Sequence, residues 1–239
     1  MDTIGITKLF KKLGQAILDL VFPIACLVCS VDGTYLCQKC HDKLARLAKQ
    51  KCLVCQKPSP FGKTHPECRT KNSVDGAIAA LDYKNRDVQK IIETFKYNFV
   101  SDLAVPLSEL LVEAIKSQNL SEYFQDFIIV PIPLHTRRHN WRGFNQALLL
   151  SQTLSEHLNI PLQDQLVRRH KFTKPQTTLN AEARKKNIEN AFELSGNPEN
   201  KKILLVDDVV TSGSTANELA KLLKRGKAAE VWILTSAHG

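Results

Sequence analysis

The chain has 239 residues, of which 43% are hydrophobic and 24% are charged, so one large or two modest globular domains are expected. Its formal net charge is +9 and its pI is about 9.2, which favours an anionic ligand, a nucleic acid or both. No apolar run approaches the length of about 18 residues that a membrane-spanning helix needs, which argues against an integral membrane protein.

Residues 1–22 are predicted to form an amphipathic helix. Lys8 and Lys12 precede an apolar stretch, but Gly14 and Asp19 interrupt the pattern, which argues against a secretory signal peptide. The helix is expected to pack on the body of the protein, with docking to a membrane surface as the alternative. We therefore expect the protein to be cytoplasmic.

The following segment contains an internal repeat. The tetrapeptide CLVC at residues 26–29 recurs letter for letter at residues 52–55, and each copy precedes a second pair of potential metal ligands. Two thiolates separated by two residues can reach one ion from a tight turn, and a second pair completes a tetrahedron. In a cytoplasmic protein this spacing is typical of zinc, and the odd number of seven cysteines also argues against a fully disulfide-bonded set.

The repeat predicts two structural zinc sites within residues 23–72, since four protein ligands leave no open position for a substrate. A segment of about fifty residues has too little core to fold by itself, so the metal is expected to supply much of its stability. Interleaved pairing of the two copies is an alternative, although serial pairing is simpler. The serial ligand sets are Cys26, Cys29, Cys37 and Cys40 for the first site, and Cys52, Cys55, His65 and Cys68 for the second.

Residues 73–239 alternate between strand and helix patterns. This alternation predicts an α/β domain with a mainly parallel twisted sheet flanked by helices, and ligands at the carboxyl ends of its strands. Strands are predicted at 77–83, 127–132, 203–206 and 231–234, and helices at 87–97, 103–115, 147–158 and 215–223.

A basic loop follows the strand at 127–132 and opens the next helix. Its arginines are planar, permanently charged donors, which suit the charge of a pyrophosphate group. A solvated basic loop or a contact to nucleic acid are the alternatives. The residues expected to bind pyrophosphate are Arg137, Arg138, Arg142 and Gly143.

Residues 168–190 form a second basic and polar stretch between two predicted core strands. A long mobile segment in this position is often a lid that closes on a substrate. A surface hairpin that binds the nucleic acid backbone is the competing interpretation.

Residues 203–215, ILLVDDVVTSGST, are the most informative motif. A buried strand leads into the adjacent carboxylates Asp207 and Asp208, followed by a small hydroxyl-rich loop and a helix start. Backbone N–H groups of such a loop and the positive end of the helix dipole suit a phosphate, and Gly213 lets the backbone approach it closely. The two carboxylates are placed to accept hydrogen bonds from ribose hydroxyls. The predicted sugar-phosphate cradle comprises Asp207, Asp208, Val209, Thr211, Ser212, Gly213, Ser214 and Thr215.

This motif resembles the phosphoribosyl-pyrophosphate (PRPP) signature of type I phosphoribosyltransferases. Together with VPIPLH at 130–135, RGFNQA at 142–147 and the cysteine repeat, it resembles the competence-protein ComF family over nearly the whole chain after residue 20. The resemblance implies a double zinc ribbon followed by a type I phosphoribosyltransferase fold. His65 stands where relatives usually have cysteine.

The resemblance also implies an activity and partners. PRPP is expected to bind with Mg2+, the basic loop to contact its pyrophosphate, and the residue 168–190 segment to act as a flexible catalytic loop with Lys174, Gln176 and Arg184 as contacts. Phosphoribosyl transfer to an unidentified acceptor, within DNA uptake during natural transformation, is the expected function. A PRPP-sensing or single-stranded-DNA-binding protein without turnover is the alternative.

Overall fold

The computed structural model describes residues 24–97, 100–137, 141, 143–173 and 181–239. The predicted helix at 1–22 lies outside these residues. The internal contacts of the chain divide it into two compact units, Met1–Leu44 and Ala45–Gly239. The cysteine repeat is therefore split, because its first copy lies in the smaller unit and its second copy lies in the larger one.

Within the smaller unit, the described residues form a short turn around the first CLVC sequence and one helix, α2 (Gln38–Lys43). The N–H of Cys26 donates to the carbonyl of Val31, and the N–H of Ser30 donates to that of Cys26, which closes the turn. Cys40 lies on α2, and Cys37 immediately precedes it. Among the described residues of this unit, the buried apolar side chains besides the cysteines are Leu36 and Leu44, as expected for a metal-stabilised turn.

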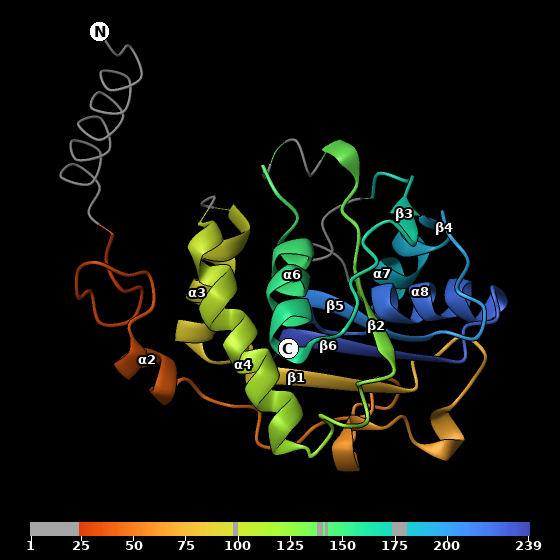
Figure 1. Ribbon diagram of the computed structural model, residues 1–239, viewed down its shortest axis with the longest axis horizontal. Coiled ribbons are helices and arrows are strands. Elements are labelled where there is room, and N and C mark those ends of the chain that lie inside the picture. The colour runs from red at the N-terminus through yellow and green to blue at the C-terminus, as the bar shows by residue number, and fades with distance from the viewer. Residues whose placement is uncertain (1–23, 98–99, 138–140, 142, 174–180) are drawn as a thin grey trace, which may run out of the picture. The chain divides into compact units, whose positions relative to one another are not determined.

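The larger unit is built on a four-stranded parallel sheet with the order β1-β6-β5-β2 (Figure 1). β5 is a central strand, between β6 and β2. The strands and helices predicted within residues 73–239 are all present, and β5 and β6 are longer than predicted. The strands are β1 (Gly76–Asp82), β2 (Phe127–Pro131), β5 (Lys202–Val210) and β6 (Glu230–His238).

Helices cover both faces of this sheet. α4 and α6 pack together and between them contact β1, β2, β5 and β6, and α8 contacts β6 (Figure 1). Successive side chains of β5 point to opposite faces of the sheet. Ile203 and Leu205 lie in one core cluster with Leu219 of α8, so the residues between them face the helices on the other side. The helices are α3 (Arg86–Tyr97), α4 (Ala104–Ser117), α6 (Gln146–Leu158) and α8 (Ser214–Arg225).

The segment predicted as a lid contains regular structure in its described residues. β3 (Val167–Arg169) and β4 (Phe192–Leu194) form an antiparallel pair, and α7 (Ala181–Ile188) lies between them in sequence. Residues 174–180, at the centre of the predicted lid, lie outside the described residues.

The second CLVC sequence joins the core of the larger unit. Short 3₁₀ turns at Pro60–Gly62 and Pro66–Cys68 follow it, and a further one at Ser101–Leu103 precedes α4. Leu53 is buried in the core cluster beneath α8. None of the described helices has the length and hydropathy needed to cross a bilayer.

Candidate functional site

A cavity of about 500 Å3 opens at the carboxyl edge of the sheet, a volume in the range of small-molecule sites. β5 and the start of α8 form its floor, and the ends of β1, α3 and β2 supply its walls. Ligands of parallel α/β sheets are expected at this edge because the strand-to-helix loops gather there. Its polar lining includes Tyr83, Lys96, Arg137, Asn145, Gln146, Arg169, Asp207, Asp208, Thr211, Ser214 and Thr215.

Residues 211–215, termed the hydroxyl loop below, turn β5 into α8. Gly213 has a φ of +70° and occupies the N-cap position of α8, so a residue with a side chain would be strained there. Ser212 Oγ lies 2.9 Å from Ser214 Oγ. Gly213, Ser214, Thr215 and Ala216 line the cavity at the start of α8, and the free amide groups and positive dipole end of a helix start favour an anion.

The two carboxylates of the motif lie within β5, which continues to Val210, instead of at its end. Parallel pairing of β5 with β6 continues through this stretch: Asp207 lies opposite Thr235, and Val210 lies opposite His238. As neighbours in a strand, Asp207 and Asp208 face opposite layers of the sheet, yet both line the cavity. The Asp208 N–H donates to Asp207 Oδ1 at 2.9 Å.

Lys96, at the end of α3, forms an ion pair with Asp208, with 3.0 Å between Nζ and Oδ1. Burial lowers the pKa of Lys96, but the attraction of Asp208 outweighs it and the net shift is upward. Burial and the neighbouring charge of Asp208 raise the pKa of Asp207 to about 7. The site therefore holds one carboxylate with a cationic partner and a second that readily takes up a proton.

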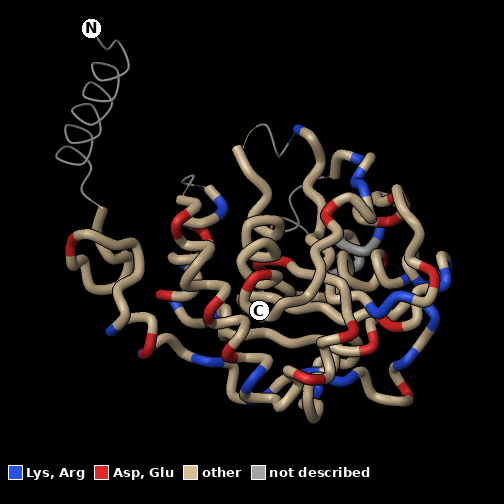
Figure 2. The backbone as a smooth tube through the Cα atoms, in the orientation of Figure 1, with Lys and Arg blue, Asp and Glu red and all other residues tan. Residues whose placement is uncertain are grey.

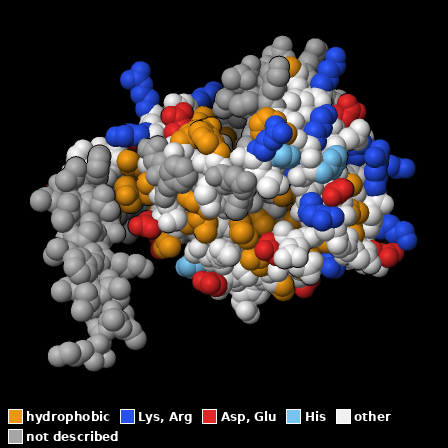
Figure 3. All heavy atoms as spheres, turned by 90° about the horizontal axis from the view of Figure 1, so that it is seen from above, with side chains coloured by type: hydrophobic (Ala, Val, Ile, Leu, Met, Phe, Trp, Pro, Cys, Tyr) orange, Lys and Arg blue, Asp and Glu red, His pale blue; other side chains and the backbone are white. Residues whose placement is uncertain are grey.

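The lining of the cavity also combines positive charge with exposed aromatic rings. Arg137 lies 5.4 Å from the ring centre of Phe172, and Tyr97 and Trp141 have ring centroids 5.8 Å apart. Trp141 is 63% exposed, although it lines the cavity. Seen from above, hydrophobic side chains lie exposed beside Lys, Arg and His side chains (Figure 3). Further Lys and Arg residues lie around α8 and the β3–β4 pair (Figure 2).

The structure brings most of the predicted cradle to this cavity. Asp207, Asp208, Val209, Thr211, Gly213, Ser214 and Thr215 all line it, as does Arg137 from the basic loop. Gly143 is exposed and has a φ of +73°. Arg138, Arg142, Lys174 and Gln176 lie outside the described residues, as does the side chain of Arg184.

Sequence reasoning missed Lys96, Tyr83 and Arg169, which also line the cavity. Lys96 follows the buried Phe95 in the last turn of a predicted amphipathic helix, where a lysine is ordinarily a solvated residue. Nothing in the local pattern shows that α3 ends beside β5. The one weak indication in the sequence that Lys96 is not fully solvated is that it follows Phe95, at the edge of the apolar face of the helix.

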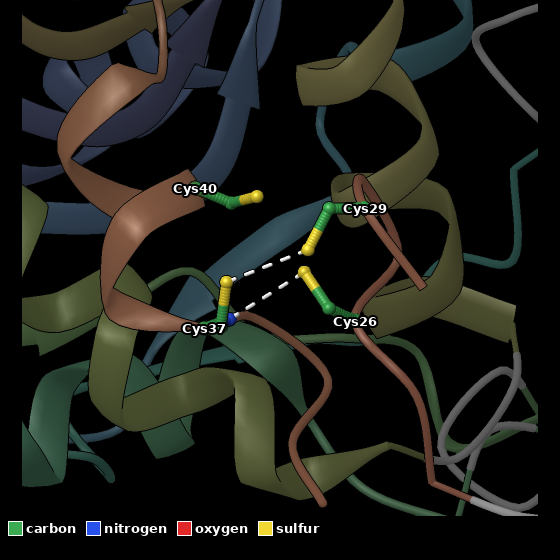
Figure 4. A group of neighbouring side chains, drawn as sticks. All are labelled: Cys26, Cys29, Cys37 and Cys40. Carbon is green, nitrogen blue, oxygen red and sulfur yellow. Dashed lines mark hydrogen bonds between the residues drawn. The ribbon is translucent and has the colours of Figure 1, made fainter. Parts of the chain in front are cut away.

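The first cysteine cluster gathers Cys26, Cys29, Cys37 and Cys40, with all four sulfur atoms within 4.8 Å of one another. Figure 4 shows the side chains converging from the turn and from α2. The 3.6 Å between the sulfurs of Cys29 and Cys37 is close to the spacing of about 3.8 Å that a tetrahedral zinc–thiolate site requires. Burial raises the pKa of Cys26, but backbone hydrogen bonds from Cys37, Cys29 and Val28 outweigh it and lower the value to about 6.

The second cluster gathers Cys52, Cys55, His65 and Cys68, again with all ligand atoms within 4.8 Å of one another. His65 Nδ1 lies 3.3 Å from Cys55 Sγ. Both clusters are thus the serial sets, and all seven cysteines are free of disulfides. Three thiolates with one imidazole, like four thiolates, are a donor set that zinc prefers.

Comparisons with known proteins agree with these features. The double zinc ribbon domain family matches residues 17–69, and the phosphoribosyl transferase domain family matches residues 145–239. The chain is 35% identical to the DNA utilization protein YhgH of Escherichia coli K12 over 218 residues, which cover 87% of this chain and 88% of that protein.

Two competence proteins are also similar. Competence protein F of Haemophilus influenzae is 38% identical over 153 residues, 62% of this chain and 67% of that protein. Competence protein ComFC of Bacillus subtilis is 30% identical over 212 residues, 82% of this chain and 81% of that protein. The chain therefore belongs to the ComF family, with a double zinc ribbon followed by a domain of the phosphoribosyltransferase fold.

Proposed function

We propose that this protein binds PRPP with Mg2+ and transfers its phosphoribosyl group to an acceptor. The observation that carries the proposal is the convergence of the paired acids, the hydroxyl loop and Arg137 on one cavity. The hydroxyl loop would hold the 5′-phosphate, Asp207 and Asp208 the ribose hydroxyls, and Arg137 with Arg169 the pyrophosphate. Each role matches the charge and hydrogen-bonding chemistry of the group assigned to it.

The reaction forms a bond from the acceptor to the anomeric carbon and breaks the bond to pyrophosphate, which leaves with the electron pair while the acceptor loses a proton. Positive charge develops on the ribose ring and negative charge on the leaving group. The carboxylates beside the ring and the arginines beside the diphosphate would stabilise these charges. Mg2+ suits the oxygen donors of PRPP and the carboxylates, and when bound it neutralises the pyrophosphate.

The remaining proposed pyrophosphate contacts are Arg138, Arg142 and Gly143 in the basic loop, with Lys174 and Arg184 in the segment before β4. Their arginine and lysine charges would complete the neutralisation that Arg137 and Arg169 begin. This assignment rests on the composition of the two segments and on their neighbours at the cavity, Arg137 and Phe172.

Titration calorimetry with PRPP and Mg2+ tests the donor substrate. Wild-type protein should bind, and the Asp207→Asn/Asp208→Asn variant should lose both binding and release of pyrophosphate while keeping its circular dichroism spectrum. Asp126→Asn is the matched control, because its carboxylate is 81% exposed and lies outside the cavity. Failure of the wild-type protein to bind PRPP would refute the proposal.

We further propose that the acceptor is a planar aromatic base. Trp141, Phe172 and Tyr97 are 63%, 49% and 42% exposed, and all three line the cavity. A group of large exposed aromatic rings at one cavity is typical of a binding site, and nucleobases stack on such rings without requiring a particular sequence. Free bases and bases of a single strand share this chemistry.

Single-stranded DNA handling in the cytoplasm, without turnover, is the second candidate function. Relatives carry the names competence protein and DNA utilization protein, and the chain is strongly basic. A DNA-binding protein of this kind should show affinity that falls steeply with salt and survives Asp207→Asn/Asp208→Asn. A PRPP-dependent enzyme should lose its activity in that variant.

A further inference from the structure

The second CLVC sequence lies directly behind the hydroxyl loop. A methyl group added to Gly213 would come within 2.4 Å of Leu53 Cγ, so the leucine side chain fills the space next to the glycine. Leu53 is 1% exposed and belongs to the core cluster that also contains Ala216, in the first turn of α8. The N-cap of α8 therefore rests on a residue between two cysteines of the second cluster.

A hydrogen-bonded chain joins the same sequence to the other end of the loop. Gln56 Nε2 donates to the Leu53 carbonyl at 2.9 Å, and Gln56 Oε1 lies 3.1 Å from His238 Nε2. His238 pairs with Val210 in the sheet, and its side chain also hydrogen-bonds to the Thr211 backbone. Leu53 thus contacts the hydroxyl loop at Gly213, and Gln56 is linked to Thr211 at the start of the loop through His238.

The position of Leu53 depends on the geometry of its neighbours Cys52 and Cys55. Their sulfur atoms gather with a ring nitrogen of His65 and the sulfur of Cys68, which follow on a separate turn, and no disulfide joins the two pieces. A shared ion is the chemical link that fits this donor set. The first cluster differs in this respect, because it belongs to the other contact unit, Met1–Leu44.

We propose that Leu53 is a positioning residue for the 5′-phosphate loop, and that the metal of the second cluster is thermodynamically coupled to phosphate binding through it. This inference rests on the proposed PRPP function for its ligand. An ion that fixes Cys52 and Cys55 holds Leu53 against Gly213 and keeps the loop amides aimed at the cavity. Coupling is reciprocal, so a bound phosphate group should in turn retain the metal.

Two neighbouring residues provide a matched pair for the test. Leu53 is buried, whereas Val54, in the same turn, is 45% exposed. Leu53→Ala should retain both zinc ions, weaken PRPP·Mg2+ binding about tenfold or more, and speed hydrogen exchange in peptides covering residues 207–219. Val54→Ala should match the wild type, and Leu53→Met, which refills most of the space, should restore slow exchange.

A second comparison uses the metal sites themselves. Cys68→Ser should speed exchange in residues 207–219, and Cys40→Ser should leave it unchanged. In the wild-type protein, PRPP·Mg2+ should slow transfer of one of two zinc ions to a chromogenic chelator. If hydrogen exchange in residues 207–219 were as slow in both Leu53→Ala and Cys68→Ser as in the wild-type protein, the proposed coupling would be overturned. Absence of PRPP binding by the wild type would refute the proposed function instead, because the exchange comparison needs no ligand.

Discussion

Lys96 Nζ lies 3.0 Å from Asp208 Oδ1, and both side chains line the cavity and are largely buried. The pair joins the last turn of α3 to the central strand β5, so it fixes the position of one carboxylate of the motif. A charge removed from water is tolerated only when it is paired and hydrogen-bonded. Asp207, the adjacent carboxylate, has its pKa raised to about 7 by burial and by Asp208.

Lys96→Met should destabilise the protein by about 3–5 kcal/mol, because it leaves the Asp208 carboxylate buried without its cation. Adding Asp208→Asn should recover much of that loss, since the uncompensated charge is then absent. Urea unfolding of both variants measures the two changes. Arg46→Met is the control: its pair with Glu113 is exposed, so the loss should be about 0–1 kcal/mol. Equal losses in Lys96→Met and Arg46→Met would contradict the assignment.

The pKa of Asp207 predicts a pH dependence of stability. Because the folded protein holds this proton more tightly than the unfolded chain, the free energy of unfolding should fall as pH rises toward about 7 and level off above it. Asp207→Asn should lack this decrease and should be more stable than the wild type at pH 8. Urea unfolding of zinc-loaded protein at pH 6, 7 and 8 tests the difference. Identical pH profiles for the two proteins would contradict it.

Trp141 should report acceptor binding by its fluorescence. The chain has two tryptophans, and Trp232 is buried, so quenching by a stacked base should come from Trp141. Trp141→Leu should weaken binding of adenine or a short single-stranded oligonucleotide by about 1–3 kcal/mol. Phe61→Leu is the matched control, because Phe61 is 48% exposed and lies outside the cavity. Unchanged affinity in Trp141→Leu would exclude stacking on this residue.

Loss of the zinc ion from the first cluster and from the second should destabilise different parts of the chain. Cys40→Ser and Cys68→Ser should each lower the zinc content from two ions to one, as measured by atomic emission. Cys40→Ser should make residues 24–44 sensitive to proteolysis while leaving the melting temperature of the larger unit unchanged, because its ligands belong to a separate contact unit. Cys68→Ser should lower that melting temperature. Equal effects on the larger unit would contradict this division.

Much of the fold and part of the site could be predicted from short patterns. The parallel α/β arrangement followed from alternating helix and strand periodicities, and both ligand sets followed from the repeated CLVC sequence. The strand at 203–206 was predicted too short, because the carboxylates after it suggested an end. β5 instead continues to Val210, since its pairing with β6 satisfies the backbone beyond Asp207.

The sequence by itself determined the two clusters of potential metal ligands and the motif at 203–215, because each depends on residues that are neighbours along the chain. The ribose and phosphate contacts proposed here extend that motif. Only the tertiary structure decided that Lys96 neutralises Asp208, that three exposed aromatic rings share one cavity, and that Leu53 supports Gly213. These contacts join residues far apart in sequence, and packing of the sheet and its helices brings them together.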